Sequence, residues 1–442
     1  MGRIVIKLCI FTNHFYPEDF KVNEIAFEFS KRGYEVTIVT AIPDYPQGKF
    51  YDGYSWFKRK KELVNGVLVY RLPIIPRGKG GKIRLLLNCV SYFISVMFFT
   101  VFSLYRKQYD AVFVHLTSPF FIGLPAVLLK RKQNIPLVFW VLDLWPESLL
   151  AAGISNSCIL NSQMKLVRYV YDNCDKILIG SSGFRKSISE KGDYDGKLVY
   201  FPNWAEDLAT PEDASIYQQV EPFANFDEDD FVVLFAGNIG EAQNLGCVLD
   251  TAMALKKNRV IKFVFLGAGR RREQLVRKSE EYNLTSTVFF LGRFPLDSMP
   301  VFMRRADVLL VSLKDIAIFN LTVPSKLQFY MAQGKPVLAM LNGDGAKLVN
   351  EARCGITVPA NDAQALLVAI KRLSEMPKDE LRCMGKNGKQ YYDTNFSRLK
   401  RIEQLDMIFS SFKEKLKVCE TVAGRNMHIM KHMVSDDLPL FE

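Results

Sequence analysis

The sequence predicts an α/β protein made of two Rossmann-like domains, each built on a parallel sheet. Three observations support this fold class. Short apolar runs alternate with helical patterns in both halves of the chain, which is typical of doubly wound sheets. Residues 206–230 are rich in Glu, Asp, Pro and Ala without a sustained apolar period, and they separate the halves as a linker. The length of 442 residues also exceeds what a single core normally supports.

The N-terminal half, residues 1–205, begins with a βαβ unit. Residues 4–12 are an apolar run, residues 23–31 have helical spacing, and Gly33 ends that helix. Further strands are predicted at residues 34–40, 67–72, 111–115, 136–142 and 176–179. Helical patterns between these runs predict helices that cover the sheet.

The C-terminal half, residues 231–395, repeats this alternation. Its predicted strands are residues 231–236, 262–266, 287–291, 308–312, 336–340 and 355–358. A long helical pattern from residue 391 to residue 416 then follows without another strand. We expect a helix at residues 396–418 to cross back onto the first domain, and residues 419–442 to form a poorly ordered tail.

Composition and cysteine usage indicate a cytoplasmic globular protein. Apolar residues make up 49% of the chain and charged residues 24%, which is ordinary for a folded domain. The eight cysteines contain no CxxC pair and are expected to be reduced thiols. The apolar run near the N-terminus is predicted to be a strand and not a secretory signal.

The net charge of +11 is concentrated in one part of the chain. Residues 58–132 contain fourteen Lys or Arg against two acids, Glu62 and Asp110. Such a patch favours an anionic partner, either a phosphorylated substrate or an acidic membrane surface. No nucleic-acid-binding signature accompanies it, so nucleic acid is not an expected partner.

An uncharged stretch of 21 residues, 85–105, lies inside this basic region. It is long enough to span a bilayer, but Asn88, Ser91 and Ser95 fall on one helical face. The favoured interpretation is a helix that packs on the sheet and touches an anionic membrane surface, with its flanking basic residues, at the inner face of the plasma membrane.

Glycine-rich loops after the strands of the C-terminal half are the first candidates for binding a ligand. Ligands of parallel sheets bind outside the carboxyl ends of the strands, where helix N-termini favour anions. Gly237, Asn238 and Gly240 follow residues 231–236. Because the two glycines have no side chain, backbone N–H groups of this loop can approach a diphosphate. Gly267 and Gly269 follow the next strand, where they are weaker evidence because they can serve only a tight turn.

Two further segments of this half are candidates. Arg293 and Phe294 follow the third strand and can hold a planar base, although a simple turn is an open alternative. Pro324, Ser325 and Lys326 begin a helix, where Ser325 can cap free N–H groups. A lysine at a helix N-terminus is unfavourable unless an anion is bound, so this segment is interpreted as a diphosphate clamp; the alternative is a solvated lysine.

In the N-terminal half, Asp143, Glu147 and His14 are the catalytic candidates. Asp143 and Glu147 directly follow a buried strand, and carboxylates are costly to bury in a dry core. Asp143 as a helix cap and His14 as a buried structural histidine remain open alternatives. No His, Cys or Asp cluster has the spacing of a metal site, and no nucleophile elbow or P-loop is present.

Taken together, these segments resemble the family-four retaining glycosyltransferases of the GT-B fold, in the branch that builds bacterial O-antigen and capsule and includes L-fucosamine transferases. The matching segments are residues 14–17, DYPQGK at 44–49, DLWPES at 143–148, AGNIGEAQ at 236–243, LGAG at 266–269 and VPSKLQFYMAQGKPVLA at 323–339. As a set they extend over most of the chain and are specific.

The resemblance implies a UDP-sugar donor bound mainly by the second domain and an acceptor held by the first. By position, Gly240, Ser325 and Lys326 would hold the diphosphate. Arg293 and Phe294 would lie at the base, and Asp143 at the reacting sugar or the acceptor. Members of this family generally need no metal, because helix N-termini and cations stabilise the departing diphosphate.

The sequence departs from the family pattern in two places. Many members have two glutamates eight positions apart, the second of which binds the ribose, but Leu321 and Phe329 stand there. Glu351 is the replacement candidate for the ribose. The histidine that often precedes the Asp143 position is also absent, because Leu142 occupies it.

The expected reaction is transfer of a sugar, such as the N-acetylated aminosugars L-FucNAc or GlcNAc, from UDP to a lipid-linked or growing glycan. The expected acceptor is a saccharide on a lipid of the undecaprenyl diphosphate type, and the anomeric configuration is retained. A UDP-sugar 2-epimerase and a catalytically silent glycan-binding scaffold of the same fold are the alternatives. The epimerase would need further acid/base carboxylates and no basic helix facing a membrane.

Overall fold

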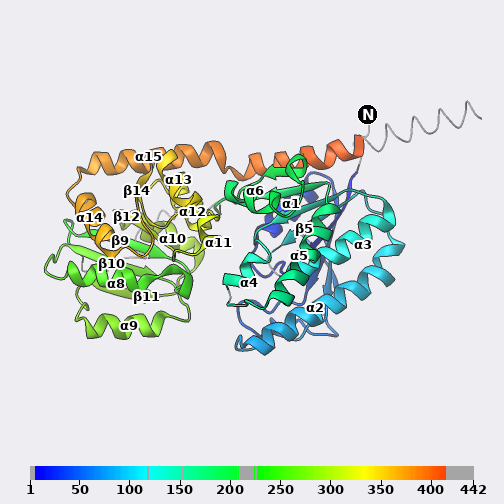
Figure 1. Ribbon diagram of the computed structural model, residues 1–442, viewed down its shortest axis with the longest axis horizontal. Coiled ribbons are helices and arrows are strands. Elements are labelled where there is room, and N and C mark those ends of the chain that lie inside the picture. Colours follow the sequence, from blue (N-terminus) through cyan, green and yellow to red (C-terminus); the bar gives the residue numbers. More distant parts are fainter. Residues whose placement is uncertain are drawn as a thin grey trace, which may run out of the picture.

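The computed structural model describes residues 5–116, 119–151, 153–206, 208, 223 and 226–414. Within these ranges the chain forms an eight-stranded sheet and a six-stranded sheet, each covered by helices (Figure 1). The predicted α/β fold with two parallel-sheet domains is therefore confirmed. The tail at 419–442 and most of the predicted linker lie outside the described residues.

The first sheet has the strand order β3-β4-β2-β1-β5-β6-β7-β8, and only the edge pair β3–β4 is antiparallel. Its strands are β1 (Lys7–Thr12), β2 (Glu35–Ala41), β3 (Lys61–Val64), β4 (Val67–Leu72), β5 (Ala111–Leu116), β6 (Leu137–Val141), β7 (Lys176–Ile179) and β8 (Leu198–Tyr200). Its helices are α1 (Lys21–Lys31), α2 (Lys82–Phe102), α3 (Gly123–Gln133), α4 (Glu147–Ala151), α5 (Ser157–Asp172) and α6 (Ser182–Ser189). The sequence does not predict β3 or β8, because β3 reads Lys-Glu-Leu-Val and β8 has three residues.

The second sheet has the order β11-β10-β9-β12-β13-β14, and every pair is parallel. Its strands are β9 (Phe231–Ala236), β10 (Ile261–Leu266), β11 (Val288–Gly292), β12 (Val308–Ser312), β13 (Val337–Met340) and β14 (Gly355–Val358). Its helices are α8 (Leu245–Ala254), α9 (Arg272–Glu281), α10 (Met299–Arg305), α11 (Ala317–Asn320), α12 (Ser325–Ala332), α13 (Asp344–Glu351), α14 (Ala363–Ser374) and α15 (Lys378–Asn395).

Both sheets reverse their strand order beside the first strand of the domain. β1 lies between β2 and β5, and β9 lies between β10 and β12. At such a switch point the loops of neighbouring strands lead to opposite faces of the sheet and leave room for a ligand. The topology therefore places candidate sites at the carboxyl ends of β1 and β9.

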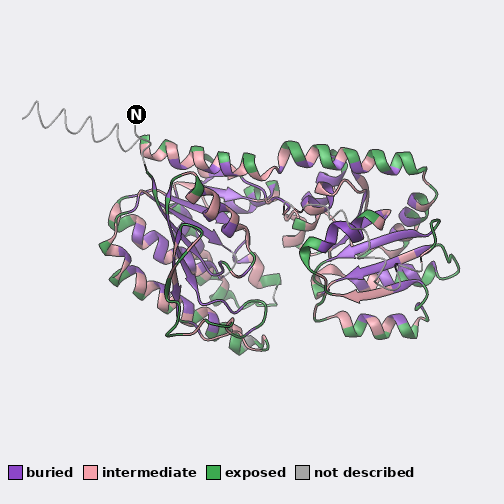
Figure 2. Cartoon of the chain, turned by 180° about the vertical axis from the view of Figure 1, so that it is seen from behind, coloured by how far each residue is buried: buried purple, intermediate pink, exposed green. Residues whose placement is uncertain are grey.

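Apolar side chains fill both faces of each sheet. Figure 2 shows most strand residues in the colour of buried residues. β5 and β9 are buried along their whole length, as expected when helices cover both faces of a parallel sheet. Each domain thus has its own core, and the polar residues at the strand ends are held on a rigid support.

A helix of the C-terminal half crosses back onto the first domain, as predicted. After α15, a second helix at residues 398–414 continues along the same edge of the molecule (Figure 1). The predicted single helix from residue 391 is wrong, because α15 already begins at Lys378 and the two helices are separated at Phe396. Phe396 leaves the helical conformation and its ring packs in the core of the second domain.

The helix at residues 398–414 belongs to the core of the first domain. Leu405 and Phe409 are buried there. Asp406 accepts a hydrogen bond from Arg32 at 3.1 Å, and Lys413 pairs with Asp110 at 3.0 Å. The crossing helix therefore fixes one edge of the gap between the domains.

A buried carboxylate forms a second link between the domains. Asp344, the first residue of α13, accepts hydrogen bonds from the hydroxyls of Ser181 and Ser182 at 2.7 and 2.8 Å and from the backbone N–H of Gly183. Burial alone would raise the pKa of Asp344, but these hydrogen bonds hold it below its ordinary value. The carboxylate of one domain thus caps the N-terminus of α6 in the other.

Phe409→Ala is expected to lower the free energy of unfolding of the first domain by about 3–5 kcal/mol. The ring is 1% exposed and packs edge-on against Phe29 and Phe113. Urea unfolding followed by circular dichroism measures the change. The matched control is Met407→Ala on the outer face of the same helix, where the side chain is 66% exposed, and a loss below about 0.5 kcal/mol is expected. Equal losses for both variants would contradict the docking of this helix.

Candidate active site between the domains

A cleft of about 300 Å³ lies between the two domains. Both domains and the connection between them line it, with Asp19, Phe20, Lys21, Asn203, Trp204, Glu206, Ser325, Lys326 and Phe329. Lys21 is tied to Glu206 at 2.7 Å and to Glu24 at 3.0 Å. Two lysines, Lys21 and Lys326, line the cleft, and the first of them is neutralised by these acids.

The loops after β9 and β10 contact each other through their backbones. A Cβ atom on Gly267 would lie 1.9 Å from the carbonyl oxygen of Gly237, and one on Gly269 would lie 2.1 Å from that of Ile239. Gly237 and Gly267 also have φ angles of +140° and +138°, which favour glycine. The close approach thus requires glycine at 267 and 269, and the φ angles favour it at 237 and 267.

The N–H groups of these loops are largely used inside the protein. Gly237 donates to the carbonyl of Leu266 at 2.9 Å, and Gly240 donates to the Gln243 side chain at 3.1 Å. The prediction that these two N–H groups face a diphosphate is therefore not supported by their hydrogen bonds. What the loop offers is space, together with the exposed side chain of Asn238.

Lys326 extends over this space. A Cβ atom on Gly237 would lie 2.5 Å from Cε and 2.9 Å from Nζ of Lys326, and Nζ lies 5.2 Å from the centre of the Phe235 ring. Among the described residues, no hydrogen bond or ion pair to an acid is found for Nζ. Burial lowers the pKa of Lys326 to about 8. An unneutralised cation in such a place is suited to an anionic ligand.

The start of α12 differs from the prediction in one detail. Pro324 is the N-cap residue, with ψ of 135°, and Ser325 is the first helical residue. The expected cap by Ser325 is wrong, because the hydroxyl of the first helical residue cannot take the N-cap position. α12 therefore begins without a side-chain cap. The N–H of Leu327 donates to the carbonyl of Pro324 at 2.9 Å, and the helix starts at the cleft that Ser325 and Lys326 line.

The remaining donor-site candidates, Arg293, Phe294 and Glu351, do not line the cleft. Arg293 is exposed after β11, and its charge partly offsets the rise that burial causes in the pKa of Tyr51 of the first domain. Phe294 packs against Phe302 with ring centres 4.6 Å apart, so one of its faces is already used. Glu351 lies at the far end of α13, exposed and 3.4 Å from the Tyr391 hydroxyl.

In the first domain, His14 belongs to a buried polar network at the end of β1. Its Nε2 lies 2.7 Å from Arg77 and its Nδ1 lies 2.8 Å from Glu18. A guanidinium can only donate, so Nε2 accepts and Nδ1 donates its proton to the carboxylate. Both ring nitrogens are therefore engaged in holding the network.

Glu18 and Arg77 also hold Asp44, which follows β2. Glu18 accepts the backbone N–H groups of Asp44 and Tyr45 at 2.8 and 2.7 Å, and Arg77 donates its backbone N–H to Asp44 at 2.7 Å. Burial raises the pKa of Asp44. Sequence reasoning assigned no role to these three residues; the i, i+4 spacing of His14 and Glu18 was the one local signal.

Asp143 follows β6, on the same edge of the sheet as His14. One strand, β5, lies between β1 and β6, which corresponds to a separation of about 10 Å. Burial raises the pKa of Asp143 to about 6. No hydrogen bond or ion pair to its carboxylate is found among the described residues, so Asp143 is available to a ligand.

Glu147 is placed differently. Its carboxylate accepts hydrogen bonds from Lys191 at 2.6 Å and Ser187 at 2.7 Å. These contacts tie α4 to α6, because Lys191 follows that helix directly and is buried. The structure thus gives Glu147 internal partners and does not bring it together with Asp143 and His14.

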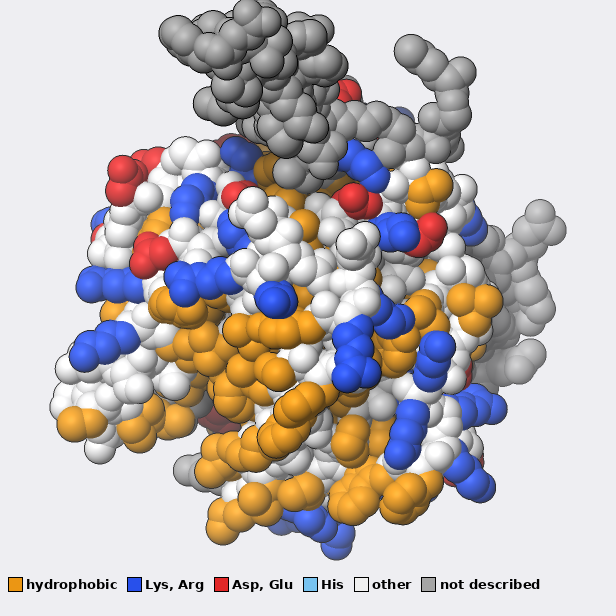
Figure 3. All heavy atoms as spheres, turned by 90° about the vertical axis from the view of Figure 1, so that its right-hand side faces the viewer, with side chains coloured by type: hydrophobic (Ala, Val, Ile, Leu, Met, Phe, Trp, Pro, Cys, Tyr) orange, Lys and Arg blue, Asp and Glu red, His pale blue; other side chains and the backbone are white. Residues whose placement is uncertain are grey.

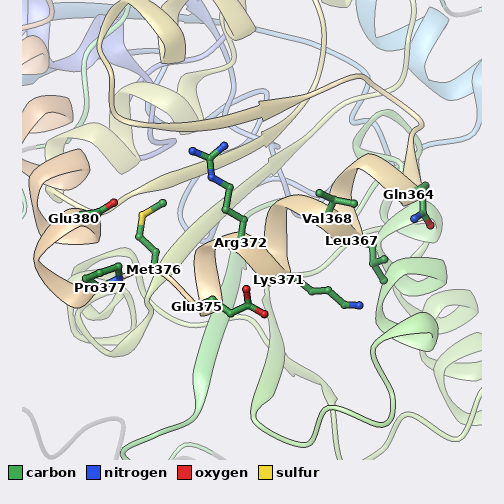
Figure 4. A pocket seen from close by; sticks show the side chains of 9 residues that line it. All are labelled: Gln364, Leu367, Val368, Lys371, Arg372, Glu375, Met376, Pro377 and Glu380. Atoms are coloured by element: carbon green, nitrogen blue, oxygen red, sulfur yellow. The ribbon is translucent and has the colours of Figure 1, made fainter.

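A second hollow, of about 560 Å³, lies along α14 and the turn into α15 (Figure 4). Its lining residues are Gln364, Leu367, Val368, Lys371, Arg372, Glu375, Met376, Pro377 and Glu380. No residue predicted for the site is among them. Of the residues predicted for the site, Ser325 and Lys326 line the cleft at α12.

Two family models match the chain. Residues 21–204 match the glycosyl transferase 4-like domain, and residues 218–391 match the glycosyl transferases group 1. The chain is 27% identical over 332 residues to the probable glycosyltransferase WbjE of Pseudomonas aeruginosa, covering 74% of this chain and 81% of the relative. It is 24% identical over 345 residues to the putative colanic acid biosynthesis glycosyl transferase WcaI of Escherichia coli K12, covering 74% and 82%.

Solved structures share the fold. Sucrose-phosphate synthase from Thermosynechococcus elongatus has a TM-score of 0.72 at 15% identity, covering 93% of this chain and 100% of that one. Anabaena Alr3699/HepE in complex with UDP and glucose has a TM-score of 0.64 at 15% identity, covering 92% and 100%. The chain is thus built from a glycosyl transferase 4-like domain followed by a group 1 glycosyl transferase domain, arranged in the GT-B fold.

Proposed function

We propose that the protein is a retaining, family-four glycosyltransferase of bacterial surface polysaccharide synthesis, such as O-antigen or capsule. It transfers an N-acetylated aminosugar, such as L-FucNAc or GlcNAc, from a UDP donor to a lipid-linked or growing glycan. The observation that carries the proposal is the unneutralised Lys326 above Gly237 in the interdomain cleft. The colanic acid assignment of WcaI and the UDP bound to HepE support it.

The arrangement suits cleavage of a sugar–diphosphate bond. The bond between the anomeric carbon and the phosphate oxygen breaks, and its electron pair goes to the leaving UDP. The acceptor oxygen bonds to the anomeric carbon on the same face, and its proton passes to the carboxylate of Asp143. Lys326 and the N-terminus of α12, which has no side-chain cap, stabilise the negative charge that develops on the diphosphate, which is why we infer no need for a metal.

Asp143 is the carboxylate that faces the reacting sugar or the acceptor in this proposal. Burial raises its pKa to about 6, so the carboxylate is still mostly ionised at neutral pH. It can therefore accept a hydrogen bond or a proton from a hydroxyl. Arg293 and the loop around Phe294 are proposed to lie at the base, and Glu351 remains the proposed contact of the ribose. The two family models favour transfer over the 2-epimerase alternative.

Lys326→Met is expected to weaken UDP binding about tenfold or more, because it removes a charge-assisted hydrogen bond to the diphosphate. Isothermal titration calorimetry in the presence of EDTA measures the affinity. Wild-type affinity should fall as the pH rises through about 8, where Lys326 loses its charge, whereas the variant should be insensitive to pH in this range. The control is Lys371→Met on α14, an exposed lysine outside the cleft. Wild-type affinity in Lys326→Met would overturn the proposed donor site.

Asp143→Asn is expected to reduce turnover about 100-fold while UDP affinity stays within about twofold. Turnover is measured by mass spectrometry with a panel of UDP-sugars and a lipid-linked acceptor. The wild-type rate should fall as the pH drops through about 6, because the carboxylate is then protonated, and this acid limb should vanish in the variant. Glu147→Gln is the comparison variant. Because Glu147 forms an ion pair with Lys191, any loss of activity in this variant should be accompanied by a loss of thermal stability. An unchanged acid limb in Asp143→Asn would exclude Asp143.

The proposal also places the protein at the membrane through α2. Among the described residues, one helix, Ile83–Arg106, is long and apolar enough to cross a bilayer, with a mean hydropathy of 2.1. Its polar residues point inward: Tyr92 donates to the carbonyl of Thr12, Asn88 to that of Ile75 and Ser95 to that of Pro73. These hydrogen bonds hold α2 on its own domain, which supports a helix that lies on the membrane and does not span it.

The outer face of α2 is apolar, the reverse of an ordinary surface helix. Its exposed side chains are Ile83, Leu86, Leu87, Val90, Ile94, Phe98, Val101 and Phe102. Figure 3 shows hydrophobic side chains gathered in a broad band on this side of the domain, with Lys and Arg beside it. An apolar stripe about 28 Å long flanked by cations suits the surface of an anionic bilayer.

Ile94→Asp with Phe98→Asp is expected to reduce binding to vesicles that contain phosphatidylglycerol by at least about tenfold, because two charges would enter the apolar layer. Co-sedimentation with the vesicles at low and high salt measures binding. The control is Val368→Asp, which adds a charge at an exposed valine of the second domain. Equal sedimentation of all three proteins would remove α2 as the membrane contact.

A further inference from the structure

Basic side chains of both domains meet at the start of α2. A Cβ atom on Gly78 would lie 3.4 Å from Nε of Arg84, and one on Gly80 would lie 3.1 Å from Nη2 of Arg270. Arg270, which follows β10, also donates to the carbonyl of Gly80 at 3.4 Å. Lys79 is exposed between the two glycines. Three cations thus surround one loop, and one of them comes from the opposite domain.

No acid neutralises this group. Within the described residues, Lys79, Arg84 and Arg270 form no ion pair, whereas Arg271 beside them pairs with Glu241 at 3.1 Å. Arg293 adds a further positive charge near Tyr51, in a loop adjacent to that of Arg270. Like charges gathered without a counter-charge repel one another, and an anion that binds between them relieves the repulsion.

The apolar stripe of α2 starts at the same place. Ile83 is 77% exposed, and Leu86 and Leu87 follow within the first turns of the helix. Cations at one end of an exposed apolar stripe match an amphiphile with an anionic head and a hydrocarbon tail. The ordinary lipids of a bilayer would be met by the cations at the two ends of α2, but they do not account for a contribution from the second domain.

We propose that Lys79, Arg84 and Arg270 bind the diphosphate head of a lipid whose chain runs along the outer face of α2. The inference deepens the proposed function and rests on it, since the lipid is the carrier of the acceptor saccharide. The head is held by both domains at the edge opposite the crossing helix, because α2 and α9 lie on the far side of the molecule from α15 (Figure 1). In this proposal acceptor binding joins the two domains at this edge.

The test uses farnesyl diphosphate as the probe, with farnesol and inorganic pyrophosphate as the probes that lack the head or the tail. Titration calorimetry on the full-length protein should give the tightest binding for farnesyl diphosphate. Arg84→Ala and Arg270→Ala should each weaken it about fivefold, as expected for one charge contact at a solvent-exposed site. Both variants should keep wild-type affinity for UDP, which also shows that they are folded.

Arg277→Ala is the matched control, because Arg277 lies on α9 close in sequence to Arg270 but is exposed and pairs with Glu273. It should bind farnesyl diphosphate as the wild type does. Unchanged binding in Arg84→Ala and Arg270→Ala, or an equal loss in Arg277→Ala, would overturn the inference. Displacement of farnesyl diphosphate by UDP would assign the probe to the donor site and overturn it as well.

A vesicle experiment separates a lipid diphosphate from bulk anionic lipid. One set of vesicles is made of phosphatidylcholine with a small fraction of undecaprenyl diphosphate. In the second set, phosphatidylglycerol replaces the undecaprenyl diphosphate, and its fraction is chosen to give the same surface charge. Selective loss of binding to the first kind in Arg270→Ala is expected, whereas equal losses on both kinds would identify the occupant as ordinary headgroups and contradict the inference. A wild-type protein that binds farnesyl diphosphate but no UDP would refute the proposed function and leave this site standing.

Discussion

The backbone contact between the loops after β9 and β10 is the constraint on which the donor site depends. Gly267 and Gly269 approach Gly237 and Ile239 so closely that a Cβ atom at either position would overlap a carbonyl oxygen. Gly237 itself has no side chain, which leaves an opening above it. Lys326 fills that opening with its aliphatic chain, and its ammonium group has no acid beside it among the described residues. Local glycine chemistry thus positions a free cation at a switch point of the sheet.

The domains are joined at places that leave the cleft open between them. The helix at residues 398–414 is part of the core of the first domain, although it follows the second domain in the chain. Asp344 caps α6 from across the gap, and Arg270 reaches Gly80 at the opposite edge. The hydrogen bonds of Asp344 are short and buried, whereas the Arg270 contact is long and exposed. The contact at α2 is therefore the weaker of these two links.

The sequence was sufficient to predict the fold, and it singled out two residues that the structure brings together. Apolar runs such as residues 231–236 predicted β9 because a strand buried on both faces must be apolar throughout. Gly237 and Lys326 were each singled out from local turn and helix chemistry. Their mutual contact could not be predicted, because it joins positions 89 residues apart that only the packing of α12 brings together. The prediction of free N–H groups at Gly237 and Gly240 is not supported for the same reason, because only the folded loops show which acceptors these groups bind.

The first domain shows the limit of local reasoning more clearly. His14 was recognised, but Arg77 and Asp44 enter its network from distant loops without a motif of their own. Glu147 carried the same local signal as Asp143, yet Lys191 neutralises it. In α2, Asn88, Ser91 and Ser95 were seen to share a face, but periodicity cannot tell whether a polar face points to solvent or to the sheet. Hydrogen bonds to the carbonyls of Pro73 and Ile75 decide that it points inward.

A crystal structure of the protein with UDP tests the central claim most directly. The account predicts the diphosphate within hydrogen-bond distance of Lys326 Nζ and the first N–H groups of α12, with the base beside the loop of Arg293 and Phe294. UDP bound elsewhere, in the hollow along α14 or among the residues around His14, would contradict it.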